Sequence, residues 1–363
     1  MSTNRLYFID AVRAFAILMM LQGHFIDTLL AVEYRDPAST AYNTWSYFRG
    51  ITAPIFFTIS GLIFTYLLIK AKLRNQDKMR IRKGFMRGLL LIGIGYALRI
   101  PVFQWLEGVF TSYVLVVDVL QCIGLSLILI VAFYKLTFKK TFLFSMLMLV
   151  LGTLIFLFEP WYRDLTLEQV PLVIANYMSK SNGSIFTILP WFGYMAYGAF
   201  IATLFYGYLE RPRFKVSIVS GFLVIGLLLI NYSSHLLMKL YYFTEILIFK
   251  QSANYNYLFS RLGDVLVIFG LFYLCERLLK HALIFKIGQK TLSIYVIHFI
   301  IMYGSFTGVG LSQVIGKTLD PTQAIIGAII FLTVVCILSL YRVKTNAFVY
   351  AKIRQLFDRL KAA

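Results

Sequence analysis

The sequence predicts an all-α polytopic membrane protein whose helices form one bundle. Of its 363 residues, 60% are hydrophobic and only 14% are charged, whereas soluble domains carry about 25% charged residues. The mean hydropathy is +0.77. The apolar residues come in long runs, and roughly 20 helical residues cross a bilayer core. These observations predict about ten transmembrane helices, with both ends of the chain in the cytoplasm.

The expected helices follow the apolar runs in chain order. Some runs are shorter than an ideal span, and several contain glycine or proline, which spans tolerate when neighbouring groups satisfy the backbone. The runs cover residues 8–31, 51–69, 88–106, 114–134, 141–158, 186–207, 216–233, 264–280, 291–310 and 324–342.

The distribution of Lys and Arg predicts the topology. With the N-terminus inside, the inner connections and the C-terminal tail hold 24 of these residues and the outer segments hold 8. This alternation is the positive-inside pattern, and an omitted or false span would break it downstream. The net charge of +19 therefore needs no nucleic-acid partner. We divide the chain into a transmembrane domain, residues 1–345, and a basic amphipathic tail, residues 346–363, on the inner membrane surface.

Several classes of site find no support in the sequence. The three cysteines, Cys122, Cys275 and Cys336, lie in apolar runs without paired spacing, which is typical of packing residues. No metal-binding, P-loop or dinucleotide-binding pattern occurs, so we expect no metal. No cleavable signal peptide is expected either, because the first apolar run is long and lacks a following cleavage site.

Four ionisable residues occupy the first expected span, "FIDAVRAFAILMMLQGHFIDTLLA". At 100° per residue, Asp10, Arg13, His24 and Asp27 fall in one sector of about 100°. Such groups usually face a protein interior or water, so this face is expected to line a cavity. His24 is a candidate general base about 16 Å above Arg13, with Asp27 placed to orient its ring. The alternatives are an Asp10–Arg13 pair that eases the helix past the headgroups and a packing histidine.

Further polar residues lie at the ends of other spans or inside them. Arg49 enters the outer end of the second span, Asp118 and Gln121 lie one turn apart in the fourth, and His298 lies in the ninth. These are candidates for binding an acceptor or stabilising an oxyanion. Trp45 belongs to an aromatic outer segment that forms either a membrane-surface belt or a platform for sugars.

The segment "IDAVRAFAILMMLQGH" resembles the opening of transmembrane acyltransferases, with ten residues between Arg13 and His24. Four later segments resemble the heparan-α-glucosaminide N-acetyltransferase-like proteins and their bacterial relatives. They are "WSYFRGITAPIFFTISG", "DVLQCIGLSL", "ILPWFGYMAYGAFIA" and "IGQKTLSIYVIH", and they occur in the expected order. The lysosomal branch carries its active histidine in the loop after the first span, but residues 32–50 contain none. The resemblance therefore places the role on His24 and leaves transfer to nitrogen or oxygen open.

The resemblance implies that acetyl-CoA is the acyl donor and a carbohydrate or glycolipid the acceptor, across a bacterial inner membrane. His24 would act as general base or transient acyl carrier. The basic stretch 70–87 offers Arg80, Arg82, Lys83 and Arg87 for the phosphates of CoA, although topology alone explains their charge.

Two other function classes stay open. A proton-coupled secondary transporter of a small polar or sugar-like solute also carries polar residues along one face of a span, but we see no internal repeat. A lipid- or sugar-binding scaffold without chemistry is the third. The oligomeric state is undetermined, with a homodimer as one possibility.

Overall fold

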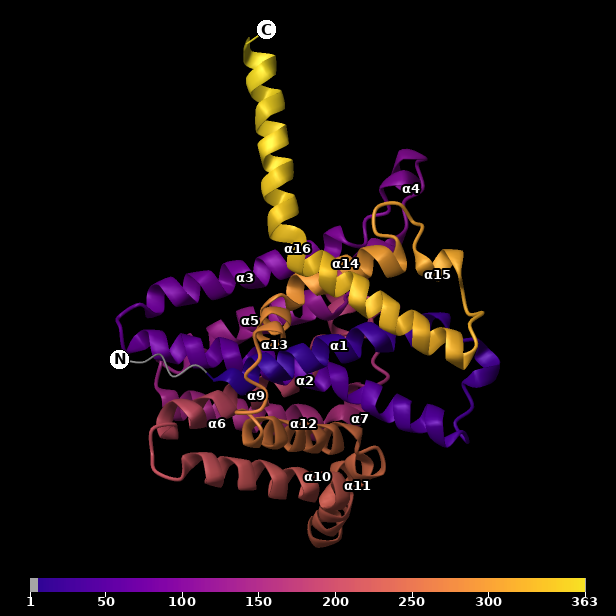
Figure 1. The fold of residues 1–363 in the computed structure, drawn as a ribbon. Coiled ribbons are helices and arrows are strands. Elements are labelled where there is room, and N and C mark those ends of the chain that lie inside the picture. The colour runs from indigo at the N-terminus through magenta and orange to yellow at the C-terminus, as the bar shows by residue number, and fades with distance from the viewer. Residues whose placement is uncertain (1–5, 363) are drawn as a thin grey trace.

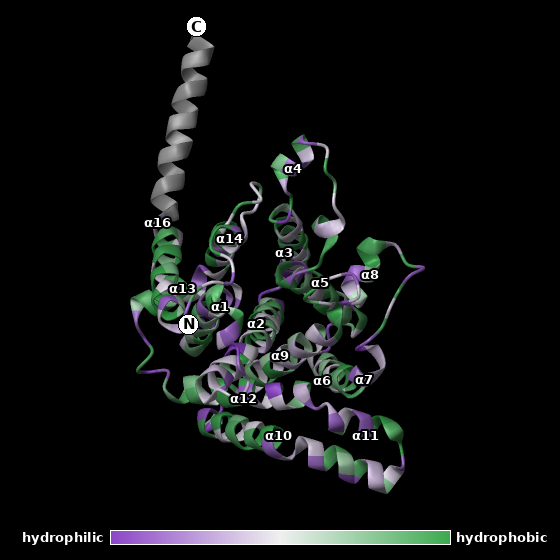
Figure 2. Ribbon diagram, turned by 90° about the vertical axis from the view of Figure 1, so that its right-hand side faces the viewer, coloured by the Kyte–Doolittle hydropathy of each residue, from purple (hydrophilic) through white to green (hydrophobic). Residues whose placement is uncertain are grey.

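The computed structural model describes the backbone of residues 6–362 and the side chains of residues 6–341. In that part of the chain the secondary structure is α-helical, with two short 3-10 helices and one isolated backbone bridge between Leu30 and Leu319. The spanning helices run side by side (Figure 1), and Figure 2 looks along them. The predicted all-α polytopic membrane fold is confirmed.

Seven helical segments are long and apolar enough to cross a membrane. The pair α13 (Ala282–Gln289) and α14 (Thr291–Tyr303) is bent by 67° and is either one broken span, which would make eight, or a re-entrant loop. The total of ten spans and the sides of the termini stay predictions. The seven are Tyr7–Leu29 (α1), Thr40–Lys72 (α2), Ser112–Leu136 (η2 with α5, Val119–Leu136), Ile188–Tyr208 (α9), Phe214–Thr244 (α10), Tyr257–Leu274 (α12) and Pro321–Tyr341, the first part of α16 (Pro321–Ala362).

The two remaining predicted spans are helices with less typical features. α6 (Thr141–Leu157) is apolar but only 17 residues long. α3 (Asp77–Ala97) begins well before the expected span at 88–106 and includes most of the basic stretch predicted as a connection. The tail is helical as part of α16, but its amphipathic character lies outside the described side chains. Short helices occupy the connections: α4 (Val102–Leu106), α7 (Glu159–Tyr162), α8 (Leu172–Met178), α11 (Leu247–Asn254) and α15 (Leu311–Val314).

Glycines allow the central helices to approach closely. A Cβ added at Gly198 of α9 would lie 1.9 Å from the carbonyl oxygen of Thr58 on α2. One added at Gly61 of α2 would lie 2.2 Å from the carbonyl oxygen of Met195. Small residues at helix contacts are the usual device in membrane bundles, where van der Waals packing replaces the hydrophobic effect between helices. The α2–α9 pair is therefore a tight central unit (Figure 2).

An ion pair joins the α5–α6 connection to the first residue of α3. Lys139 in the α5–α6 connection bonds the carboxylate of Asp77, the first residue of α3. This hydrogen bond is the main cause that lowers the pKa of Asp77 below its ordinary value. The pair fixes the start of the helix that carries the basic residues discussed below.

Candidate active site

Two cavities lie along the same face of α1, one toward each end of the helix. The outer cavity has a volume of about 960 Å³ and is lined by His24 and Asp27 among others. The inner cavity has a volume of about 340 Å³ and is lined by Arg13. Asp10 is buried, lies 3.9 Å from Arg13 and lines neither cavity. The predicted polar stripe is therefore divided between two sites and a buried ion pair.

His24 is held by two side chains of α14. Its Nδ1 lies 3.3 Å from Nε2 of His298 and 3.2 Å from the hydroxyl oxygen of Tyr303. His298 is fully buried, whereas His24 is half-buried in the wall of the outer cavity. Among the described residues, no hydrogen bond reaches Nε2 of His24. When Nδ1 donates its proton to either partner, Nε2 keeps a lone pair, which a general base requires.

The carboxylate of Asp27 pairs with arginines. One of its oxygens lies 3.0 Å from Nη1 of Arg49 and 3.9 Å from Nη1 of Arg35. Arg35 also donates to the backbone carbonyls of Asp27 and Leu30, which satisfies the end of α1. The structure differs from the expected orientation of the His24 ring by Asp27, because the ion pairs of the Asp27 carboxylate, both at Oδ1, are with the two arginines. Asp27 instead holds Arg49 at the cavity wall.

Arg49 has room beside α1 because residue 23 is glycine. A Cβ at Gly23 would lie 3.3 Å from Cγ of Arg49. The guanidinium carbon lies 5.7 Å from the ring centroid of Trp45, and the indole of Trp45 donates to Gln22 at 2.8 Å. Trp45 is not among the residues that line the outer cavity. Trp45 therefore contacts Arg49 and Gln22 outside the outer cavity, and its place in a membrane-surface belt or a sugar platform stays a prediction.

A buried ion pair forms another part of the outer cavity wall. Nη2 of Arg99 lies 2.8 Å from Oδ2 of Asp118, and both residues line the cavity. Asp118 is also the N-cap of α5, in a capping box with Gln121. Gln121 is fully buried and packs against Gly95 of α3. A Cβ added at Gly95 would lie 2.4 Å from the side-chain amide of Gln121. Gln121 therefore fixes the start of α5 and does not line the cavity, contrary to its predicted role with the acceptor.

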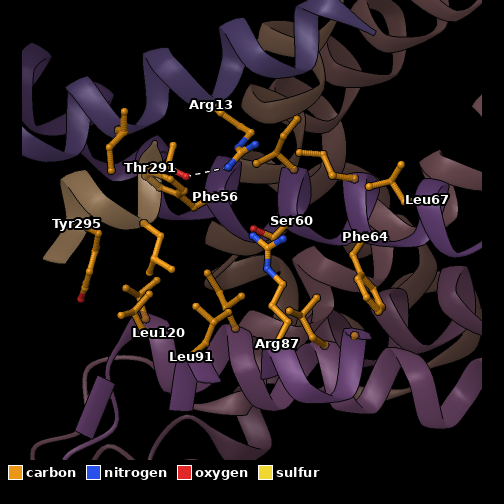
Figure 3. A pocket seen from close by; sticks show the side chains of 18 of the residues that line it. Arg13, Phe56, Ser60, Phe64, Leu67, Arg87, Leu91, Leu120, Thr291 and Tyr295 are labelled. Carbon is orange, nitrogen blue, oxygen red and sulfur yellow. Dashed lines mark hydrogen bonds between the residues drawn. The ribbon is translucent and has the colours of Figure 1, made fainter. Parts of the chain in front are cut away.

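The inner cavity combines basic side chains that face each other across it with an apolar lining on either side. Figure 3 shows Arg13 from α1 and Arg87 from α3 pointing into it from opposite sides. Arg13 donates to the hydroxyl oxygen of Thr291 at 2.8 Å, which fixes its guanidinium against α14. Aliphatic side chains line the rest of the cavity, and in Figure 3 Leu91 and Leu120 lie on the side toward Tyr295. The others include Ile17, Ile59, Ile63, Ile123 and Leu127. Such a cavity suits a molecule with an anionic end and a long uncharged arm.

Three of the four basic residues predicted on the stretch 70–87 line this cavity. Arg80, Lys83 and Arg87 are three and four residues apart, so they share one face of α3. Arg82 is about 160° from Arg80 around the helix and is exposed, away from the cavity. Arg82 is therefore placed differently from the prediction. Binding of CoA by the other three stays a prediction.

Sequence reasoning missed Arg99, Arg261 and Tyr303. Arg261 pairs with Asp264 at 3.0 Å and lines the outer cavity. A signal that could have drawn attention to more of α14 than His298 is the spacing of Thr291, Tyr295 and His298, which places polar groups on one helical face. Arg99 lies inside the expected span 88–106, so it was a charge of the same kind as Arg13 on the first span, whereas Arg261 lies just before the expected span 264–280 and carried no comparable signal.

Comparison with known proteins agrees with this architecture. The family model described as heparan-alpha-glucosaminide N-acetyltransferase, catalytic, matches residues 5–245. The match includes His24 and ends before α14. No curated protein matches the chain significantly. Because the matched region is more than half of the chain, this integral membrane protein belongs to the heparan-α-glucosaminide N-acetyltransferase family.

Proposed function

We propose that this protein transfers an acetyl group from acetyl-CoA in the cytoplasm to the amine or hydroxyl of a carbohydrate or glycolipid across the membrane. The observation that carries the proposal is the pair of cavities on one face of α1, with basic residues at one and His24 at the other. The positive-inside pattern supports cytoplasmic termini and an inner cavity that opens to the cytoplasm. A bacterial inner membrane is the location we propose.

The inner cavity is the proposed donor site. Arg80, Lys83 and Arg87 on one side and Arg13 on the other offer cationic donors for the phosphates of CoA. The aliphatic side chains that line the cavity toward Tyr295 suit the uncharged pantetheine arm. The thioester at the end of that arm would then lie toward His24.

His24 is the proposed general base. Its Nε2 takes the proton of the acceptor O–H or N–H as the acceptor atom attacks the thioester carbonyl carbon. The C–S bond breaks, the acetyl group remains on the acceptor, and CoA leaves as the thiolate, which receives the proton. General-base help of this kind contributes roughly 10²- to 10⁴-fold in rate.

Arg49 is the proposed donor to the oxyanion of this reaction. It lies in the cavity wall with His24, and its salt bridge to Asp27 fixes its position. Removing one oxyanion donor typically lowers kcat by about 10²- to 10³-fold. Arg99 and Arg261 lie further along the same wall and suit hydroxyl groups of a carbohydrate.

The test is transfer of radiolabelled acetyl from acetyl-CoA in proteoliposomes, with His24→Ala and with His235→Ala as the matched control. His235 is an exposed histidine on α10 and lines neither cavity. We expect His24→Ala to lose nearly all transfer and His235→Ala to keep it. Undiminished acetyl transfer by folded His24→Ala protein would contradict the proposal.

A second matched pair tests the donor site. Arg87→Gln should raise the KM for acetyl-CoA, whereas Arg82→Gln on the opposite face of α3 should not. The same vesicles address the transporter alternative, which requires uptake of an unmodified solute without acetyl-CoA. Uptake of that kind, with no acetyl transfer, would favour the transporter.

A further inference from the structure

Four residues line both cavities. They are Met20, Phe56, Val119 and Tyr295, and each comes from a different helix: α1, α2, α5 and α14. The two cavities therefore meet at one place, where four helices each contribute one side chain. We refer to these four residues as the constriction.

On each helix the constriction residue lies between residues that line only the inner cavity and residues that line only the outer cavity, apart from Met19 of α1, which lines the outer cavity and directly precedes Met20. On α1, Met20 follows Arg13 and precedes His24. On α2, which runs the other way, Phe56 follows Arg49 and precedes Ser60. Four independent helices thus place the boundary at the same level. The corresponding orders are Asp118, Val119, Ile123 on α5 and Thr291, Tyr295, Phe299 on α14.

The constriction is largely apolar, although charged groups flank it on both sides. Met, Phe and Val offer water no hydrogen bonds, and Tyr adds one hydroxyl. Hydrophobic constrictions of this kind block ions by losing their water. Without one, the two cavities would form a continuous polar path between the two ends of the bundle.

We propose that Met20, Phe56, Val119 and Tyr295 form the permeability barrier of the protein and the passage for the acyl thioester. The position suits both roles. By helical rise, Met20 lies about 6 Å below His24 and about 10 Å above Arg13. A narrow, uncharged thioester arm displaces the apolar side chains and reaches the base, whereas hydrated ions do not pass. The passage role rests on the proposed acetyl transfer, but the barrier role does not.

The barrier is tested without any acyl donor. Wild type, Phe56→Ala and Phe64→Ala are reconstituted in phosphatidylethanolamine–phosphatidylglycerol vesicles, and proton leak is followed with an entrapped pH dye under an imposed potassium gradient. Phe64 is the matched control, because it lines only the inner cavity. We expect Phe56→Ala to leak about tenfold faster than wild type and Phe64→Ala to stay tight. An equal rate of proton leak in all three proteins would contradict the barrier role of the constriction.

Met20→Ala is the second variant, in case Phe56→Ala fails to fold as judged by gel filtration and helical circular dichroism. It removes a smaller side chain from the same constriction, so a leak above that of Phe64→Ala supports the barrier. A folded Met20→Ala protein as tight as wild type contradicts it.

Free CoA tests the passage role. Added to leaky Phe56→Ala vesicles, it should lower the proton leak, because its arm fills the enlarged constriction. A leak that CoA does not change overturns the passage role while the barrier stands. His24→Ala should lose acetyl transfer while its proton leak stays equal to that of wild type. The leak therefore tests the constriction, and the transfer tests the proposed chemistry, independently of each other.

Discussion

Removal of the two hydrogen bonds at Nδ1 of His24 is expected to slow acetyl transfer without unfolding the protein. His298→Leu replaces a fully buried imidazole with an apolar side chain, and Tyr303→Phe removes one hydroxyl. Replacing a buried polar partner by an apolar group can be nearly neutral for stability when no other buried group loses its only bond. Each variant leaves the other partner in contact with His24.

The magnitudes follow from this shared contact. One hydrogen bond is worth about 0.5–1.5 kcal/mol net, so each single variant should lower kcat by about two- to twelvefold if the bond orients the base. The double variant leaves the ring free to turn. The decrease in kcat of the double variant should approach the whole general-base contribution, roughly 10²- to 10⁴-fold, and exceed the product of the decreases in the two single variants.

The assay is single-turnover acetyl transfer with saturating acetyl-CoA, measured for His298→Leu, Tyr303→Phe, the double variant and His298→Gln. Glutamine keeps a polar group near the position of the imidazole Nε2, so His298→Gln should recover most of the rate. A double variant no slower than the product of the single losses would refute the shared orienting role. A single His298→Leu loss as large as that of His24→Ala would identify His298 as the base.

Three further predictions concern stability. Arg99→Met should lower the free energy of unfolding by about 3–5 kcal/mol in a denaturant titration in detergent, because it strands the buried charge of Asp118, and the loss should shrink when Asp118 is also neutralised. Gly198→Ala should cost about 1–3 kcal/mol by the same titration through overpacking against α2, whereas Gly207→Ala, with no atom within 4 Å of the added Cβ, should be nearly neutral. Because the pKa of Asp77 is lowered in the folded protein, its contribution is complete above the ordinary value of 3.8 and is lost as pH falls below it. Asp77→Asn should therefore show less acid-dependent loss of melting temperature than wild type, and parallel pH curves would contradict this.

The polar face of α1 was predictable because it depends only on helical periodicity. Arg13, His24 and Asp27 all line one of the two cavities, and the inner and outer separation follows from helical rise. The partners of these residues were not predictable. Asp27 is three residues from His24 on the same helix, so local spacing favoured that contact. In the fold it meets Arg49, which the approach of α2 at Gly23 brings to its carboxylate.

The residues at which helices begin were predicted least well from the sequence. Hydropathy locates apolar runs, but it does not see helical residues that lie beyond the apolar segment. α2 begins at Thr40, where Ser39 caps the helix, and therefore includes Trp45 and Arg49, which were expected in a connection or at its edge. α3 includes the basic residues for the same reason. Asp118 and Gln121 likewise looked like intramembrane polar groups, although their spacing is that of a capping box.

The contact between His24 and His298 joins residues separated by 274 positions, from the first and one of the last helices of the bundle. During synthesis, α1 enters the membrane long before α14 exists. A chain interrupted before residue 298 would therefore hold a histidine with neither of its α14 partners. We expect nascent and truncated chains to be inert toward acetyl-CoA. Synthesis of the chain through Tyr303 would then be the step that completes the surroundings of His24.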